Sequence, residues 1–342
     1  MDDLAHGTRN KRGDWTPKNP ADIAPIWAFP PKPLSVLKWL PSYFLPYDVI
    51  FFASAFAWWY WVMPDMETVR AFDLASWGTW SWIMRLFVVN TVALFAFFGV
   101  FQLRLYTLRS QGTRFKYNGQ FPADKQSDVF WFKRQDVDSA LRILFHAMPI
   151  WTAIEVVILL AYAKGYATWW TLADHPVYLV ILTLLIPIIH ETHFYLIHRL
   201  IHVPVLYKYI HSVHHNSVNP SPYSSLSMHP VELLLYLGMA FWQLLIPSNP
   251  ILAIYALHRA GFGAIPGHVG FDKIEVGKES GVDTHAYIHY LHHKHFEVNY
   301  GDGLIPFDKW FGTFHDGSKH GQELMDARYA KKVAKLNKSA AE

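Results

Sequence analysis

Three histidine runs decide how this chain folds: His198-Arg-Leu-Ile-His202, His211-Ser-Val-His214-His215 and His289-Tyr-Leu-His292-His293. They lie between residues 190 and 295, a stretch that holds 15 of the 20 histidines in the chain. Within each run the histidines follow the first one at three or four residues, which places them on one face of a helix. Eight imidazoles are twice what one tetrahedral zinc ion needs. The pattern therefore predicts a site for two metal ions.

The composition is that of a membrane protein with a substantial aqueous portion. Hydrophobic residues make up 52% of the 342 residues and charged residues only 17%, which is too apolar for an ordinary soluble domain. The net charge of +3 is too small to indicate a nucleic-acid partner. Cysteine is absent, which excludes disulfides, thiolate zinc sites and cysteine-ligated iron–sulfur clusters. The first forty residues also lack the apolar core of a cleavable signal peptide.

Four apolar segments, at residues 47–63, 83–103, about 148–163 and 177–189, approach the roughly 20 residues that a helix needs to cross a bilayer. We therefore expect an all-α membrane protein with about four transmembrane helices in the domain 47–189. The segment 1–46 is basic and proline-rich, so we predict no long helix there. A disordered tail is expected to about residue 24, and an interfacial segment after it.

The basic residues predict the orientation. Segment 1–46 has six basic residues and the connection 104–146 has eight, whereas the two opposite loops have only Arg70 and Lys164. By the positive-inside rule both termini are expected in the cytoplasm, in a bacterial inner membrane or the endoplasmic reticulum. After four crossings, residues 190–316 would form a cytoplasmic histidine-rich helical cap. Residues 317–342 are predicted to be a polar, lysine-rich helix or tail.

A further apolar pair lies at 231–265, broken by Pro247-Ser-Asn-Pro250. We predict a re-entrant or amphipathic helical hairpin, although a six-crossing bundle also fits the sequence. The hairpin would keep His229 and His268, at its ends, near the metal site. Two ionisable residues fall near the apolar segments. For His146 we expect interfacial depth, and for Glu155 an interhelical hydrogen bond.

The histidine pattern also limits the chemistry. His190-Glu-Thr-His193 is not a metalloprotease motif, because that motif needs histidines four residues apart and position 194 is Phe. An all-imidazole ligand set suits iron, zinc or copper.

The three runs resemble, in order, the histidine boxes of the fatty acid hydroxylase (sterol desaturase) superfamily of membrane di-iron enzymes. Met228-His229-Pro-Val-Glu232 and His268-Val-Gly-Phe-Asp272 are similar to elements that lie between the boxes, and Phe307-Asp-Lys-Trp-Phe-Gly-Thr313 to one that follows them. The resemblance covers roughly residues 190–316. It implies two iron ions, with zinc as a possible substitute in purified protein. It also implies O2-dependent hydroxylation or desaturation of a lipid C–H bond.

The resemblance assigns roles to individual residues. The expected metal ligands are His198, His202, His211, His214, His215, His289, His292 and His293, with His268 and His229 as further candidates. Metal-bound histidines usually need a partner for the other ring nitrogen, for which the candidates are Glu191, Glu232, Asp283, Asn299 and Asp308. Tyr195 is a candidate for lining the site. We expect His190, His193, His285 and His295 to be bystanders.

The implied partners are a lipid from the bilayer and a separate electron donor, cytochrome b5 or a ferredoxin with its reductase. The lipid could be a sterol, sphingoid, fatty acyl or polar lipid; the oligomeric state is left open. One alternative is a metal-binding or transport protein, which should place its ligands near the bilayer midplane on broken helices. Another is a zinc-dependent lipid hydrolase, which needs one ion and a general base. A structural protein with a degenerate site is a third, but the intact runs oppose it.

Overall fold

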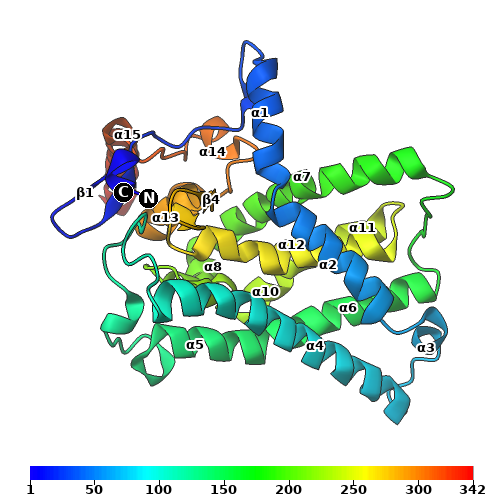
Figure 1. Ribbon diagram of the computed structural model, residues 1–342. Helices are drawn as coiled ribbons and strands as arrows, with labels where there is room; N and C mark the ends of the chain where they lie inside the picture. Colours follow the sequence, from blue (N-terminus) through cyan, green and yellow to red (C-terminus); the bar gives the residue numbers. More distant parts are fainter. Residues whose placement is uncertain (342) are drawn as a thin grey trace.

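The computed structural model describes residues 1–341, and most of this chain is helical (Figure 1). Three helical segments are long and apolar enough to cross a membrane: Trp77–Thr107, Gln135–Ala163 and Pro176–Ile201. A fourth is the pair α1 (Pro33–Phe44) and α2 (Tyr47–Trp61), bent by 43° at its break. The prediction of an all-α membrane protein with about four transmembrane helices is confirmed.

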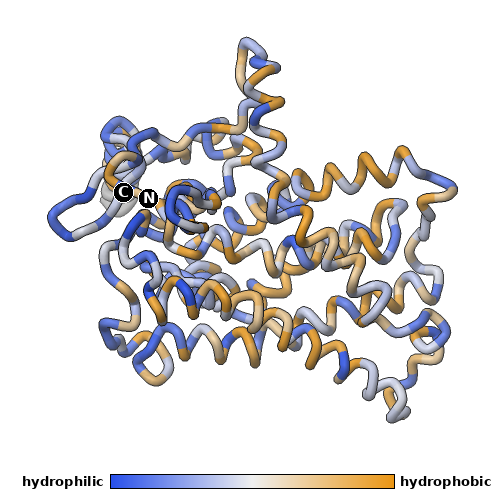
Figure 2. Tube along the Cα trace, viewed as in Figure 1, coloured by the Kyte–Doolittle hydropathy of each residue, from blue (hydrophilic) through white to orange (hydrophobic). Residues whose placement is uncertain are grey.

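The first of these segments is α4 (Trp77–Phe101), extended by a π-helical turn. The second joins α5 (Gln135–Arg142) to α6 (Met148–Ala163) through another π-helical turn, and the third is α7 (Pro176–Ile201). Apolar residues predominate along these helices (Figure 2). Many of them face outward: Val92 on α4 is 63% exposed and Leu184 on α7 is 53% exposed. Apolar exposure on this scale fits contact with lipid.

The predicted hairpin is present. Its first arm is α10 (Pro230–Leu237), continued by short helices to Leu245, and its second arm is α12 (Pro250–His268). Asn249 caps α12 by accepting the backbone N–H of Leu252 at 3.0 Å. Within residues 1–341, neither arm reaches the length and hydropathy of the four segments above. Most of α12 is buried, and it packs chiefly against α2.

Two expectations for residues 1–46 are wrong. Instead of a disordered tail, β1 (Gly7–Arg9) pairs antiparallel with β2 (Trp15–Pro17), and Trp15 is buried against Phe115 and Tyr117. This contact is 100 residues distant in sequence, so no local pattern signals it. The proline-rich part also forms the twelve-residue helix α1. Proline is tolerated in the first turn of a helix, and the single interior Pro41 does not end it.

The chain after α12 forms the end of the molecule that carries the histidines. It contains the antiparallel strands β3 (Lys273–Glu275) and β4 (Gly281–Asp283), then α13 (Tyr287–His295), α14 (Phe307–Trp310) and α15 (Lys319–Ala341). The lysine-rich tail is thus a helix. Both termini lie at this end (Figure 1). The exposure of this histidine-bearing end to the cytoplasm remains a prediction, and so do the domain limits given above.

Short elements connect the rest. They are η1 (Asp3–Ala5), η2 (Pro25–Trp27), α3 (Met66–Arg70), η3 (Gln102–Thr107), η4 (Pro122–Asp124), η5 (Trp131–Lys133), η6 (Ile143–Ala147), α8 (Pro204–Leu206), η7 (Tyr207–His211), α9 (Ser212–His215), η8 (Pro222–Leu226), η9 (Gly238–Phe241) and α11 (Trp242–Leu245).

Candidate metal centre

Each histidine run lies on helical backbone. His198 is in the last turn of α7 and His202 is the residue that caps it. The second run occupies η7 and α9, and the third occupies α13. His268 is the last residue of α12. Four helix ends therefore bring the imidazoles to one place.

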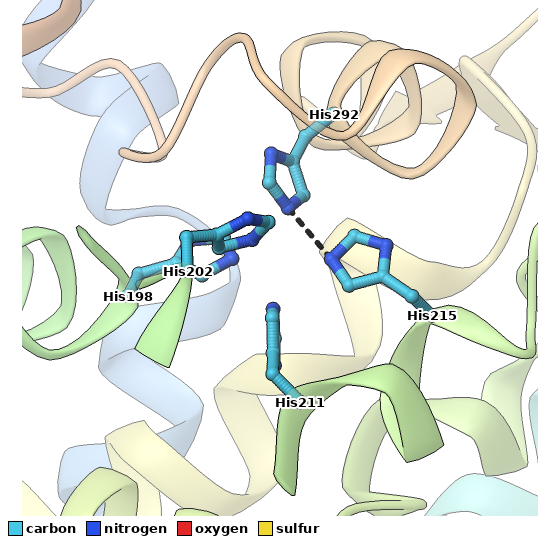
Figure 3. A group of neighbouring side chains, drawn as sticks. All are labelled: His198, His202, His211, His215 and His292. Carbon is cyan, nitrogen blue, oxygen red and sulfur yellow. Dashed lines mark hydrogen bonds between the residues drawn. The ribbon is translucent and has the colours of Figure 1, made fainter. Parts of the chain in front are cut away.

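The structure divides nine of these histidines into two groups, and within each group the ligand atoms lie within 4.8 Å of one another. The five-histidine group, whose rings point toward a common centre in Figure 3, consists of His198, His202, His211, His215 and His292. The four-histidine group consists of His214, His268, His289 and His293.

The second and third runs contribute to both groups. His211 and His215 join the five-histidine group, whereas His214 between them joins the other. On α13, His292 and His293 likewise point to different groups. Neighbouring positions on a helix point about 100° apart, so one helix can serve two sites. The two groups adjoin, since the ring centroids of His215 and His293 are 4.9 Å apart.

Hydrogen bonds determine the tautomers in the five-histidine group. Nδ1 of His198 lies 2.7 Å from the carbonyl oxygen of Tyr300, and Nδ1 of His292 lies 2.6 Å from that of Val298. Nδ1 of His211 is 2.7 Å from Oε1 of Glu232. A carbonyl or carboxylate oxygen accepts, so each Nδ1 carries the proton and donates. In the neutral rings the Nε2 atoms then have free lone pairs.

The Nε2 atoms of the two groups converge on one another. Nε2 of His215 and His292 are 3.0 Å apart, and Nε2 of His268 is 3.2 Å from those of His214 and His293. Nε2 of His211 is buried and has no hydrogen-bond partner within residues 1–341. Nitrogens about 2.1 Å from a tetrahedral metal ion are about 3.4 Å apart. The donor set fits two metal ions.

Burial favours the protonation state that binds metal. It lowers the pKa of His214, His289 and His293 well below the usual value, and the neighbouring histidines lower it further. These imidazoles are neutral near pH 7. Neutral imidazole is the form that coordinates a metal ion.

Of the candidate partners, Glu232 alone bonds a ring nitrogen of the two groups directly. Asp308 accepts the backbone N–H groups of Tyr300 at 3.0 Å and Gly301 at 2.8 Å. Glu191 and Asn299 hold the same loop, residues 298–303: Glu191 accepts the N–H of Asp302 and Gly303, and Asn299 donates to the carbonyls of Ile288 and His315. These three side chains therefore act one step away, by shaping the loop whose carbonyls orient His198 and His292.

Three candidates lie away from both groups. His229 caps α10, where its Nδ1 accepts the backbone N–H of Val231 at 3.2 Å, so the expectation that it joins the ligands is not met. Tyr195 stacks on Phe307 with the ring centroids 4.7 Å apart. Asp283 is an exposed residue of β4. A capping position gave His229 a different partner, and a packing position did the same for Tyr195.

The expected bystanders differ among themselves. His193 bonds the carbonyl of Leu235 at 2.8 Å, His285 is exposed, and His295 stacks on His315. His190 is buried in the wall of the cavity described below.

Sequence reasoning missed the backbone carbonyls that orient the rings. These belong to Val298 and Tyr300, and to Ala264, which lies 3.0 Å from Nδ1 of His268. Every residue has a carbonyl, so no residue type could have signalled them. Only the path of the chain places them.

A cavity of about 460 Å³ opens beside the histidines. His198, His211, His214, His268 and His289 line one part of it. The side chains of Phe51, Phe194, Met228 and Tyr236 supply an apolar wall, and residues 21–25 also line the cavity. A mostly apolar cavity of this size can hold a small lipid or part of a larger one.

The fold and the site define the class of protein: a membrane protein that holds two adjoining groups of buried histidines beside an apolar cavity. The sequence model of the fatty acid hydroxylase family matches residues 183–313, which include all nine histidines. This region belongs to the fatty acid hydroxylase superfamily.

The relatives include a sterol desaturase and a methylsterol monooxygenase. The chain is 24% identical over 206 residues to a Delta(7)-sterol 5(6)-desaturase of Gibberella zeae, covering 53% of this chain and 57% of that protein. It is 31% identical over 157 residues to methylsterol monooxygenase 1 of Rattus norvegicus, covering 45% of this chain and 50% of that protein. The matches thus span about half the length of these relatives. No solved structure matches the chain.

Proposed function

We propose that this protein is a membrane-bound di-iron oxygenase that uses O2 and external electrons to hydroxylate or desaturate a C–H bond of a lipid. The observation that carries this proposal is the pair of buried histidine groups beside an apolar cavity in a membrane protein. The names of the relatives, sterol desaturase and methylsterol monooxygenase, support a lipid substrate.

Bound iron would supply the activation of O2 that attack on an unactivated C–H bond requires. The protein would contribute the rest. Neutral imidazoles leave the metal ions their full positive charge, and the carbonyls of Val298 and Tyr300 with Glu232 keep the Nε2 lone pairs directed inward. The apolar wall excludes water and holds the lipid chain against the histidines.

Two observations oppose the alternatives. Nine converging imidazoles exceed what a zinc hydrolase needs for one ion, and the nearest carboxylate, Glu232, is already engaged by His211. For a transporter, the ligands are expected near the middle of the spanning helices. Here His198 and His202 are in the last turn and the cap of α7. Electrons would come from a separate donor such as cytochrome b5 or a ferredoxin.

Metal analysis of anaerobically purified protein tests the proposal. We expect two iron ions per chain, and consumption of O2 when a reductant and a lipid extract are added. Mass spectrometry of the extract should then reveal one lipid that gains oxygen or loses two hydrogens. One tightly held ion per chain, with no O2 consumption under these conditions, would overturn the proposal.

A further inference from the structure

One ring of the four-histidine group has an outer nitrogen that lacks a hydrogen-bond partner but faces a carboxylate. Nε2 of His289 lies 3.2 Å from those of His268 and His293, so Nε2 is the nitrogen that faces the proposed metal ion. When Nε2 of a neutral imidazole binds metal, Nδ1 carries the proton and can only donate. Nδ1 of His289 is buried and has no hydrogen-bond partner within residues 1–341. Oδ1 of Asp302 lies 4.0 Å from it.

Two contacts fix the backbone of Asp302 beside α13. Oε1 of the buried Glu191 accepts the backbone N–H groups of Asp302 at 3.0 Å and Gly303 at 3.2 Å. Gly303 has a φ of +93°, and a Cβ at this position would lie 2.7 Å from Cδ1 of Ile288, the residue before His289. The loop therefore packs closely against the turn of α13 that carries His289.

The carboxylate of Asp302 is freer than its backbone, because the side chain is 48% exposed. An N–H···O hydrogen bond needs about 2.7–3.2 Å between nitrogen and oxygen. A movement of roughly 1 Å would therefore bring Oδ1 to the Nδ1–H of His289. Rotation of a half-exposed side chain can supply this movement while Glu191 keeps the loop in place.

The five-histidine group already contains a pair of this kind. Nδ1 of His211 is 2.7 Å from Oε1 of Glu232. His211 and His289 belong to different groups, and both line the cavity. A carboxylate that accepts the Nδ1–H of a metal ligand fixes the orientation of the ring and raises the basicity of Nε2. A bond between Asp302 and His289 would give each group one such ligand on its cavity side.

We propose that Asp302 is a positioning residue of the four-histidine group, and that its carboxylate accepts the Nδ1–H of His289 when metal is bound. This inference rests on the metal centre of the proposed function, but it requires neither O2 nor a lipid. It assigns a role to a side chain outside the candidates that the sequence indicated.

A purely structural role of Asp302 in the loop 298–303 would have a different signature. Backbone carbonyls of this loop orient His198 and His292, which belong to the five-histidine group. Damage to the loop would therefore weaken metal binding at the five-histidine group. Loss of the partner of His289 would weaken the four-histidine group alone.

The test measures zinc binding to the full chain in detergent by equilibrium dialysis, where the wild-type protein should hold two ions. Asp302→Ala should weaken one site by about 10–100-fold. Asp302→Asn keeps an acceptor oxygen and should weaken that site less, and Asp302→Glu should restore most of the affinity. The thermal unfolding midpoint of the metal-free protein should stay at the wild-type value in all three variants.

A double variant identifies the weakened site. Glu232→Ala acts on the five-histidine group through His211. Combining it with Asp302→Ala should therefore leave both sites weakened. If Asp302 acted on the five-histidine group instead, the double variant would keep one site at wild-type affinity.

Asp283→Ala is the matched control. Asp283 lines the same cavity, its side chain is 50% exposed, and its Oδ1 lies 3.8 Å from Nδ1 of His285, which is outside both groups. This variant removes the same charge from the same cavity and should leave both zinc affinities unchanged. A loss caused only by the missing negative charge would appear in both variants.

Three results would overturn the proposal: unchanged zinc affinity in Asp302→Ala, equal weakening of both sites, or the same loss in Asp283→Ala. The outcome is separable from that of the proposed function. A chain that consumes no O2 but has one zinc site that depends on Asp302 would keep this positioning role. An oxygenase whose zinc affinities do not depend on Asp302 would lack it.

Discussion

One cluster of buried polar side chains lies among the transmembrane helices, and another lies at their ends. In the first, both carboxylate oxygens of Glu155 on α6 are engaged, one by the indole N–H of Trp151 and the other by the amide of Asn90 on α4. Asn90 in turn accepts the indole N–H of Trp58 at 2.7 Å. The predicted interhelical hydrogen bond of Glu155 is confirmed.

The histidine cluster is built differently. Nδ1 of His198, His211, His268 and His292 is bonded to Glu232 or to a backbone carbonyl, whereas the inner Nε2 atoms of the cluster meet one another at 3.0–3.2 Å. Buried polar groups normally satisfy one another, as around Glu155. Where they converge and remain unsatisfied, the missing partner is a ligand. Glu155 therefore joins helices, and the histidines are arranged to bind cations.

Replacing His292 with Ala should have the largest effect, because it removes a ligand candidate whose tautomer is held by Val298. We expect lipid oxidation to disappear while the protein remains in the membrane fraction, and the metal content to fall by one ion per chain. Product analysis and metal analysis of the same preparation measure this. Retained activity would show that the third histidine run is not part of the centre.

Glu232→Ala should weaken metal binding at the five-histidine group by about 10–100-fold, because His211 loses the acceptor that orients it. Glu232→Gln keeps an acceptor oxygen and should cost less. Equilibrium dialysis with zinc should resolve one weakened site and one unchanged site. Equal weakening of both sites would contradict the division into two groups.

Asp308→Ala should have a smaller effect, on the order of tenfold or less, because Asp308 acts only through the loop that presents the Tyr300 carbonyl to His198. The same dialysis measures it. Asp326→Ala on the exposed face of α15 is the control and should bind zinc like the wild type. If Asp308→Ala weakened the four-histidine group instead, the loop would not act through His198.

Glu155→Leu should not change metal content at all. It leaves Asn90 and Trp151 without their acceptor, which we expect to lower the free energy of unfolding by about 1–3 kcal/mol. Thermal unfolding in detergent measures the loss, and Glu155→Gln should recover part of it. Loss of metal in the Glu155→Leu variant would mean that the two clusters are coupled.

Histidine spacing alone was enough to predict the helical faces and the all-imidazole donor set, while the presence of two ions stays a prediction. The lengths of the apolar segments predicted the spanning helices, and the proline break at residues 247–250 predicted the hairpin. Each of these features depends on residues close together in the chain, where periodicity directly determines the direction of a side chain.

The grouping of the histidines could not be predicted in this way. Whether His214 joins His211 or His289 depends on how α9, α12 and α13 meet, which is set by packing between distant segments. For the same reason the β1–β2 hairpin, the capping position of His229 and the carbonyls of residues 298–300 became visible only in the fold. Periodicity orients a side chain relative to its own helix, and tertiary packing decides which side chain it meets.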